Sequence, residues 1–187
     1  MAAVIHFLIL CLAASAAPVR IGTFKVDATP PLGSPLAYDI MTGVDSPLSC
    51  RGIVLLGAGD PIVLAAIDWI GLSNDGHLEF RRALAKGAST RVERVTMHTL
   101  HQHDAPRCDF SADALLAGHG MGGKNFNVGH ARKVIASVAA AVKKAGETAE
   151  PVSHLGVGTG QVRMVASNRR ILGPDGKVQH KIGRAHV

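Results

Sequence analysis

The chain has 187 residues, 47% of them hydrophobic and 18% charged, which is enough apolar material for a domain with a buried core. Its formal net charge of +6 comes with a single tryptophan and a single tyrosine. Basic residues without interleaved aromatic ones argue against a nucleic-acid-binding surface or a base-stacking platform.

The first sixteen residues have the pattern of a secretory signal peptide. Residues 4–14 read VIHFLILCLAA, an apolar run shorter than the ~20 residues that a membrane-spanning helix needs. Ala14-Ser15-Ala16 supplies the small residues of a cleavage site, although no Lys or Arg precedes the run. We expect cleavage after Ala16 and a secreted or periplasmic protein. The alternatives are an uncleaved anchor and a buried first strand.

Two cysteines, Cys50 and Cys108, would remain after this cleavage. In an oxidising compartment they could form a disulfide. Pairing requires the two Cα atoms to lie within about 7 Å, which spacing along the chain does not establish. A pair of free thiols is the alternative.

Apolar runs in the first third of the chain predict strands. We expect them at Val19–Val26, Arg51–Leu56 and Ile62–Ile67, the last two joined as a hairpin by the turn sequence GAGDP. The third run has no polar side, which is typical of a central buried strand.

Helical and extended patterns alternate in the rest of the chain. A helix should start after Ser73 and stop at Gly87, with a strand at Val92–Met97 after it. A second helix is expected at Val128–Ala145, and a long strand or hairpin arm at Val152–Val165. This order predicts an α/β fold in which a mixed β-sheet is layered with helices.

Three histidines, His98, His101 and His103, follow the strand expected at 92–97. In an extended chain, residues two apart face the same side at about 6.6 Å, so His101 and His103 would share a face. They could hold one zinc ion together, or one could bind metal while the other acts in acid/base catalysis. The alternative is a polar loop with solvated imidazoles. A catalytic zinc needs three protein ligands, and this stretch supplies two at most.

Taken in order, these segments resemble the N-terminal catalytic part of the neutral/alkaline (non-lysosomal) ceramidases. The resemblance runs from about Arg20 to Lys181. GTFKVDATP at 22–30 is similar to the family's opening Gly-x-x-x-x-Asp-x-Thr-x-Pro pattern. LHQHDAP at 100–106 matches its hallmark Thr-His-Thr-His-Ser-Gly-Pro, and NRR at 168–170 its Asn-Arg-Ser step. The chain would then be an incomplete N-terminal part of a larger catalytic domain.

The resemblance implies a zinc-dependent amide hydrolase. Such an enzyme cleaves the N-acyl bond of ceramide, or of a related N-acyl amide, to a fatty acid and an amine such as a sphingoid base. His101 would be a Zn²⁺ ligand, and His103 would act as acid/base or stabilise the developing charge. Arg169 would help to bind the reacting group. The expected partner is a lipid or N-acyl amide substrate, reached by contact with a membrane surface.

Two charged residues depart from the family pattern. Asp104 and Arg107 stand where the family has small neutral residues, which bears on whether ceramide is the substrate. Two further hypotheses therefore stay open. One is a non-catalytic secreted binding or surface protein with this fold, and the other is a metal hydrolase of the same fold with another substrate.

The last six residues, 182–187, read IGRAHV. The codons ATC GGA AGA GCA CAC GTC, one frame of a common DNA-sequencing adapter, encode this sequence, so we expect these residues to be non-native. The expected organisation is a signal peptide at 1–16, a partial ceramidase-like catalytic domain at 17–181 and the non-native tail. The resemblance places the remaining metal ligands, a His, a Glu and a Tyr, beyond Lys181, so the chain alone is expected to be inactive.

Overall fold

The computed structural model of the chain describes residues 17–163 and 170–181. They form two compact units whose boundary follows Ser153. The expected signal peptide at 1–16, the residue Arg169 and the tail at 182–187 lie outside the described residues. Within the described part of the chain, no helix is long and apolar enough to cross a membrane.

A five-stranded mixed sheet of order β5-β3-β2-β1-β7 is the centre of the first unit. Its strands are β1 (Arg20–Asp27), β2 (Ser49–Gly57), β3 (Gly59–Ile67), β5 (Val95–Thr99) and β7 (Glu150–Pro151). Strands β1, β2 and β3 pair antiparallel in sequence order, and β5 runs parallel to β3. The α/β class with a mixed sheet is therefore confirmed.

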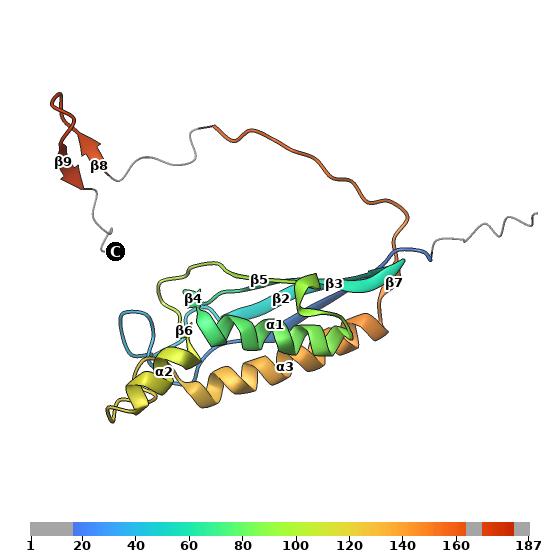
Figure 1. Cartoon of the computed structure of the whole chain (residues 1–187), viewed down its shortest axis with the longest axis horizontal. Coiled ribbons are helices and arrows are strands. Elements are labelled where there is room, and N and C mark those ends of the chain that lie inside the picture. The colour runs from blue at the N-terminus through green and yellow to red at the C-terminus, as the bar shows by residue number, and fades with distance from the viewer. Residues whose placement is uncertain (1–16, 164–169, 182–187) are drawn as a thin grey trace, which may run out of the picture. The chain divides into compact units, whose positions relative to one another are not determined.

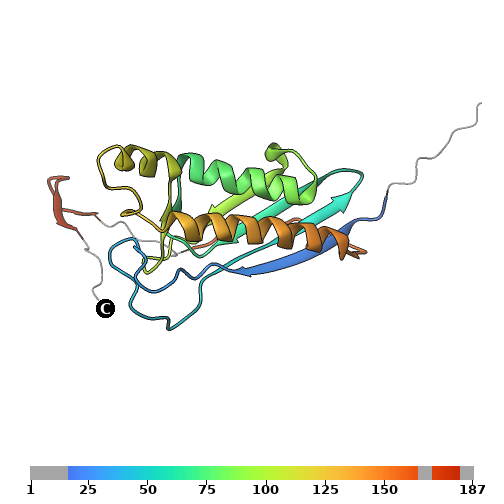
Figure 2. The ribbon, with the colours of Figure 1, turned by 90° about the horizontal axis from the view of Figure 1, so that it is seen from below.

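Two helices, α1 (Asn74–Ala88) and α3 (Val128–Glu147), lie against one face of this sheet. A third helix, α2 (Phe110–Ala117), packs against α1. Figure 1 shows α1 and α3 side by side beneath the strands, and Figure 2, seen from below, shows both lying across them. A two-stranded parallel sheet of β4 (Gly71–Leu72) and β6 (Arg107–Cys108) adjoins the start of α1.

The alternation of side chains along the strands explains why the helices pack on this face. On β3, Val63, Ala65 and Ile67 are buried toward the helices, whereas Leu64 points to the other side and is 41% exposed. Gly22 on β1 allows the closest approach, because a Cβ at this position would collide with the backbone of Ala145 in α3.

Several element boundaries differ from the sequence-based expectations. Residues Val92–Arg94 form a 3-10 turn, so the strand predicted at Val92–Met97 begins at Val95 and runs on to Thr99. The first helix continues past Gly87 to Ala88, and Ser89 ends it in the left-handed region with φ 53°. Helix α2 was not predicted.

The long strand predicted at Val152–Val165 was wrong. Residues 152–163 contain no strand. Their apolar side chains are not buried, with Leu155 72%, Val157 95% and Val162 77% exposed. The second unit has instead a small antiparallel hairpin of β8 (Arg170–Leu172) and β9 (Val178–Lys181).

Candidate functional site

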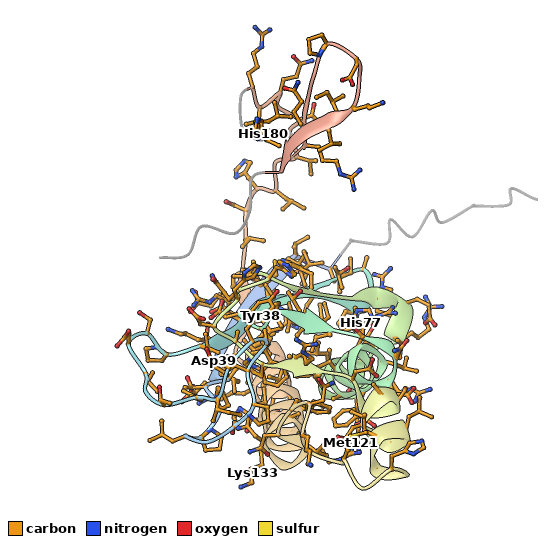
Figure 3. All side chains as sticks on the ribbon, turned by 90° about the vertical axis from the view of Figure 1, so that its left-hand side faces the viewer. Tyr38, Asp39, His77, Met121, Lys133 and His180 are labelled. Carbon is orange, nitrogen blue, oxygen red and sulfur yellow. The ribbon has the colours of Figure 1, made fainter. Side chains whose placement is uncertain are left out.

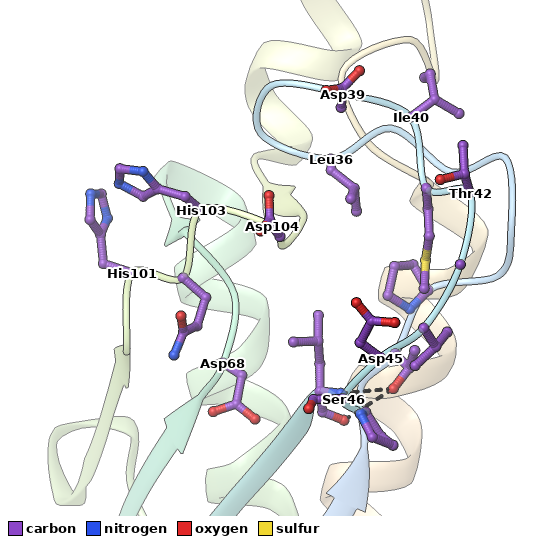
Figure 4. Close-up of a pocket in the computed structure, with 18 residues that line it drawn as sticks. Leu36, Asp39, Ile40, Thr42, Asp45, Ser46, Asp68, His101, His103 and Asp104 are labelled. Carbon is purple, nitrogen blue, oxygen red and sulfur yellow. Dashed lines mark hydrogen bonds between the residues drawn. The ribbon is translucent and has the colours of Figure 1, made fainter. Parts of the chain in front are cut away.

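A pocket of about 930 Å³ opens where β3 and β5 end. These strands are parallel, so their carboxyl ends meet at one edge of the sheet, which is where α/β proteins commonly bind ligands. Asp68, which follows β3, and residues 101–104, which follow β5, line one side. The opposite wall comes from the segment 29–48 between β1 and β2, which faces them across the pocket in Figure 4.

Hydrogen bonds hold Asp68 rigidly at this edge. Its Oδ2 accepts from the backbone N of Ser49 at 2.6 Å and from Ser49 Oγ at 2.9 Å. Arg51 donates to Ser49 Oγ at 2.6 Å and lies 3.9 Å from Asp68 Oδ2. The Asp68–Ser49–Arg51 cluster therefore presents a fixed carboxylate to the pocket.

His101 lies in a tight turn beyond the end of β5. Its backbone N donates to Trp69 O at 3.2 Å, and its φ of 61° is in the left-handed region. Its Nδ1 is 2.9 Å from Ile70 O. A carbonyl oxygen can only accept, so Nδ1 carries the hydrogen, and in the neutral ring the lone pair is on Nε2. This is the arrangement in which a histidine offers Nε2 to a metal ion.

His103 lies between two other rings. Its ring centroid is 5.2 Å from that of His101 and 5.4 Å from that of Tyr38, both in edge-to-face contact. Figure 4 shows the two histidine rings together at the edge of the pocket opposite Asp39 and Asp45. The prediction that they share an extended face was wrong, because β5 stops at Thr99 and the chain turns at His101.

The described residues do not contain a complete metal site. No group of three or more His, Cys, Asp or Glu side chains with metal-binding geometry occurs among residues 17–163 and 170–181. What this part of the chain brings together is one imidazole oriented by a backbone carbonyl and a second imidazole beside it. This fits two members of a histidine-containing zinc site, which needs further ligands for its full coordination.

The side chains of Trp69 and His130 hold the backbone at Ala28, just before the segment 29–48. Trp69 Nε1 donates to Ala28 O at 2.9 Å, and His130 Nε2 on α3 lies 3.4 Å from the same oxygen. Burial lowers the pKa of His130, opposed by its contact with Ala28 and by the Asp27 carboxylate. Asp27 Oδ1 accepts from Thr29 N at 2.8 Å, and the hydrogen bonds from Thr29 lower the pKa of Asp27.

Comparison with known proteins shows a similarity in fold to a solved structure, but no match in sequence to a known family. No family model matches the sequence, and no curated protein matches it. Among solved structures, neutral ceramidase from Pseudomonas aeruginosa is similar, with a TM-score of 0.54 and 19% identity. The chain has part of the neutral ceramidase fold. The match covers 72% of this chain and 22% of that chain, so this chain spans about a fifth of that protein.

A second solved structure, described as ceramidase complexed with C2, matches with a TM-score of 0.47 and 15% identity. This match covers 72% of this chain and 22% of that chain.

The structure shows where the side chains of Asp104, Arg107 and the two cysteines lie. Asp104 does line the pocket. Arg107 does not line it, and its guanidinium donates to Ala37 O at 2.7 Å. Cys50 and Cys108 are both buried free thiols, and burial raises the pKa of each to about 12.

Two participants in the site were not found from the sequence. Tyr38 touches His103, and Ser49 holds Asp68. Both contacts join segments far apart in the chain, so no local spacing points to them. The one available signal for Tyr38 is that it is the only tyrosine in the chain.

Proposed function

We propose that the chain is the N-terminal part of the catalytic domain of a zinc-dependent amide hydrolase. Its substrate would be ceramide or a related N-acyl amide. The observation that carries the proposal is the pair His101 and His103, with His101 Nδ1 bound to Ile70 O and the second ring 5.2 Å away. This pair lies at the edge of a pocket, in a fold similar to part of neutral ceramidase.

In this proposal His101 holds Zn²⁺ through Nε2, while Ile70 O fixes the ring. When bound, the ion supplies Lewis-acid polarisation of the amide carbonyl and activation of water. The resemblance to the family places the other ligands beyond Lys181. Export through residues 1–16 belongs to the same proposal and is supported by the sequence pattern alone.

The other side chains would bind the substrate and move protons. His103, oriented by the rings of Tyr38 and His101, delivers a proton to the leaving amine. Arg169, which lies outside the described residues, stabilises the developing negative charge. Leu36, Ile40 and other apolar residues of the segment 29–48 receive a hydrocarbon chain of the substrate, which would reach the pocket from a membrane surface.

The test uses the protein encoded by the gene read to its natural stop codon, assayed with a short-chain N-acyl sphingosine. We expect turnover that is lost with a chelator and restored by Zn²⁺. His101→Ala should abolish both zinc binding and turnover. His103→Ala should retain zinc and lose about 10²–10⁴-fold in kcat, the usual contribution of a general acid/base. His98→Ala, at an exposed position on β5, is the matched control.

The outcomes separate the hypotheses. Turnover that survives chelation would exclude the zinc mechanism. A protein that binds zinc through His101 but leaves N-acyl sphingosine intact would keep the metal site and move the search for a substrate to other amides or esters. A protein that binds no zinc would favour a secreted binding protein.

A further inference from the structure

The pocket wall formed by the segment 29–48 is fastened to the histidine side at Ala37. The backbone N of Ala37 donates to Ala105 O at 3.0 Å, and its carbonyl oxygen accepts from Arg107 Nη2 at 2.7 Å. Around Ala37 the chain turns tightly, with Leu36 N donating to Asp39 O at 2.7 Å. Both polar backbone groups at the tip of this turn are thus bonded to residues just after His103.

Arg107 reaches Ala37 from a fixed position. It lies on β6, paired in parallel with Gly71 on β4, and its side chain is half-buried. Its Nε is buried and has no hydrogen-bond partner among the described residues. A buried N–H without a partner is unfavourable, so packing and the bond to Ala37 must offset it. The guanidinium therefore bonds to the pocket wall through Nη2, while its Nε is shielded from solvent.

The fastened turn carries the residue that contacts His103. Tyr38 directly follows Ala37, and its ring meets the His103 ring at 5.4 Å with an interplanar angle of 63°. Leu36 precedes Ala37 and points into the pocket, as Figure 4 shows. In Figure 3, Tyr38 and Asp39 lie together on the face of the first unit turned toward the viewer. The hydrogen bond from Arg107 to Ala37 O thus fixes the residue between Leu36, which is in the apolar wall, and Tyr38, which contacts the His103 ring.

We propose that Arg107 is a positioning residue, which holds Ala37 so that Tyr38 packs on His103 and Leu36 stays in the pocket wall. It acts through these residues and does not contact the substrate. Only the consequence for catalysis rests on the proposed function, through the role given to His103. The positioning itself concerns the arrangement of three side chains and is tested without any assay of hydrolysis.

The decisive pair of variants is Arg107→Met and Arg107→Lys in the 187-residue chain. Methionine keeps most of the apolar stem and removes the donor, whereas lysine keeps one donor for Ala37 O. Tyr38 is the only tyrosine, so its ring protons are identified in an NMR spectrum without ambiguity. We expect the nuclear Overhauser effect between the Tyr38 and His103 rings to disappear in Arg107→Met and to persist in Arg107→Lys. Arg91→Met, which removes an exposed ion pair with Asp60, is the control.

An unchanged Tyr38–His103 contact in Arg107→Met would overturn the proposal. Global unfolding of Arg107→Met would overturn it as well, because Arg107 would then support the fold as a whole. In the complete gene product, Arg107→Met should lower kcat/KM without loss of zinc, and Arg107→Lys should restore it. If the wild-type protein hydrolyses no amide, the proposed function fails, and the NMR comparison alone decides the role of Arg107.

Discussion

The Nδ1 atom of His101 lies 2.9 Å from the carbonyl oxygen of Ile70. The same histidine has a φ of 61°, a backbone conformation that costs a non-glycine residue about 1–3 kcal/mol. The backbone bond to Trp69 and the ring bond to Ile70 together hold this conformation. Strain at a single residue whose ring is also fixed is typical of functional sites, which supports the role given to His101.

Replacement of His101 should separate backbone strain from ligand binding. Glycine adopts positive φ without penalty, so His101→Gly should be more stable than His101→Ala by about 1 kcal/mol. Urea unfolding of the two variants measures this difference. Both should lose the zinc affinity proposed for the wild-type protein, as followed by titration calorimetry. Equal stability of the two variants would contradict the strain.

Ser49→Ala should remove the hydroxyl that links Asp68 to Arg51, while the bond from the backbone N of residue 49 to Asp68 Oδ2 remains. The Ser49 hydroxyl donates to Asp68 Oδ2 at 2.9 Å and accepts from Arg51, and Ser49 itself is buried. Hydrogen bonds to charged groups contribute about 1.5–3 kcal/mol, so a loss of this size is expected in the free energy of unfolding. Ser46→Ala, at an exposed position in the same pocket, is the control. A Ser49→Ala variant as stable as the control would show that the cluster is not needed.

The free energy of unfolding should decrease as the pH is lowered, because His130 is harder to protonate in the folded protein than in the unfolded chain. Burial lowers the pKa of His130 below its usual 6.5, so the unfolded chain takes up the proton first as the pH drops. The stability contributed by the neutral ring is complete above pH 6.5 and is lost as the pH falls from there through the folded-state pKa. Unfolding by urea at pH 7.5 and 5.5 should therefore show a smaller loss for His130→Gln than for the wild type. Equal losses would refute this assignment.

Gly22→Ala tests the contact between β1 and α3. A Cβ at this position meets the backbone oxygen of Ala145, which cannot move without displacing the helix. Overpacking of this kind costs about 1–3 kcal/mol. Gly57→Ala, where the nearest atom to the added Cβ would be a Val19 methyl carbon at 3.8 Å, should be nearly neutral. Thermal unfolding followed by circular dichroism gives both values, and similar melting temperatures would rule out the close approach.

Sequence patterns predicted the elements whose apolar residues repeat regularly. Ile62–Ile67 lies within β3, and Val128–Ala145 lies within α3. A continuous apolar run is typical of a buried strand, and an apolar stripe at helical spacing is typical of a helix with one buried face. Helix α2 was missed because it is only 8 residues long and begins beside the loop after His103. Its N-terminus depends on Asp109, whose side chain accepts from Ala112 N at 3.0 Å.

The site was predictable only where its residues are neighbours in sequence. His101 and His103 were expected to lie together and do so, although through a turn and not through a shared strand face. Their contacts with Ile70 and Tyr38 depend on how the chain returns to the edge of the sheet. Such long-range contacts have no signature in local spacing.

The one-sided packing of helices on the sheet has a practical consequence for handling the protein. On the face away from α1 and α3, Ile53 of β2 pairs with Leu64 of β3, which is 41% exposed. The outward residues that flank this pair, Leu55 and Ile62, are also paired and only partly buried. An apolar row of this kind adsorbs to alkyl resins and air–water interfaces, most strongly in ammonium sulfate. Purification should therefore keep the salt low and the protein dilute, with a mild detergent present.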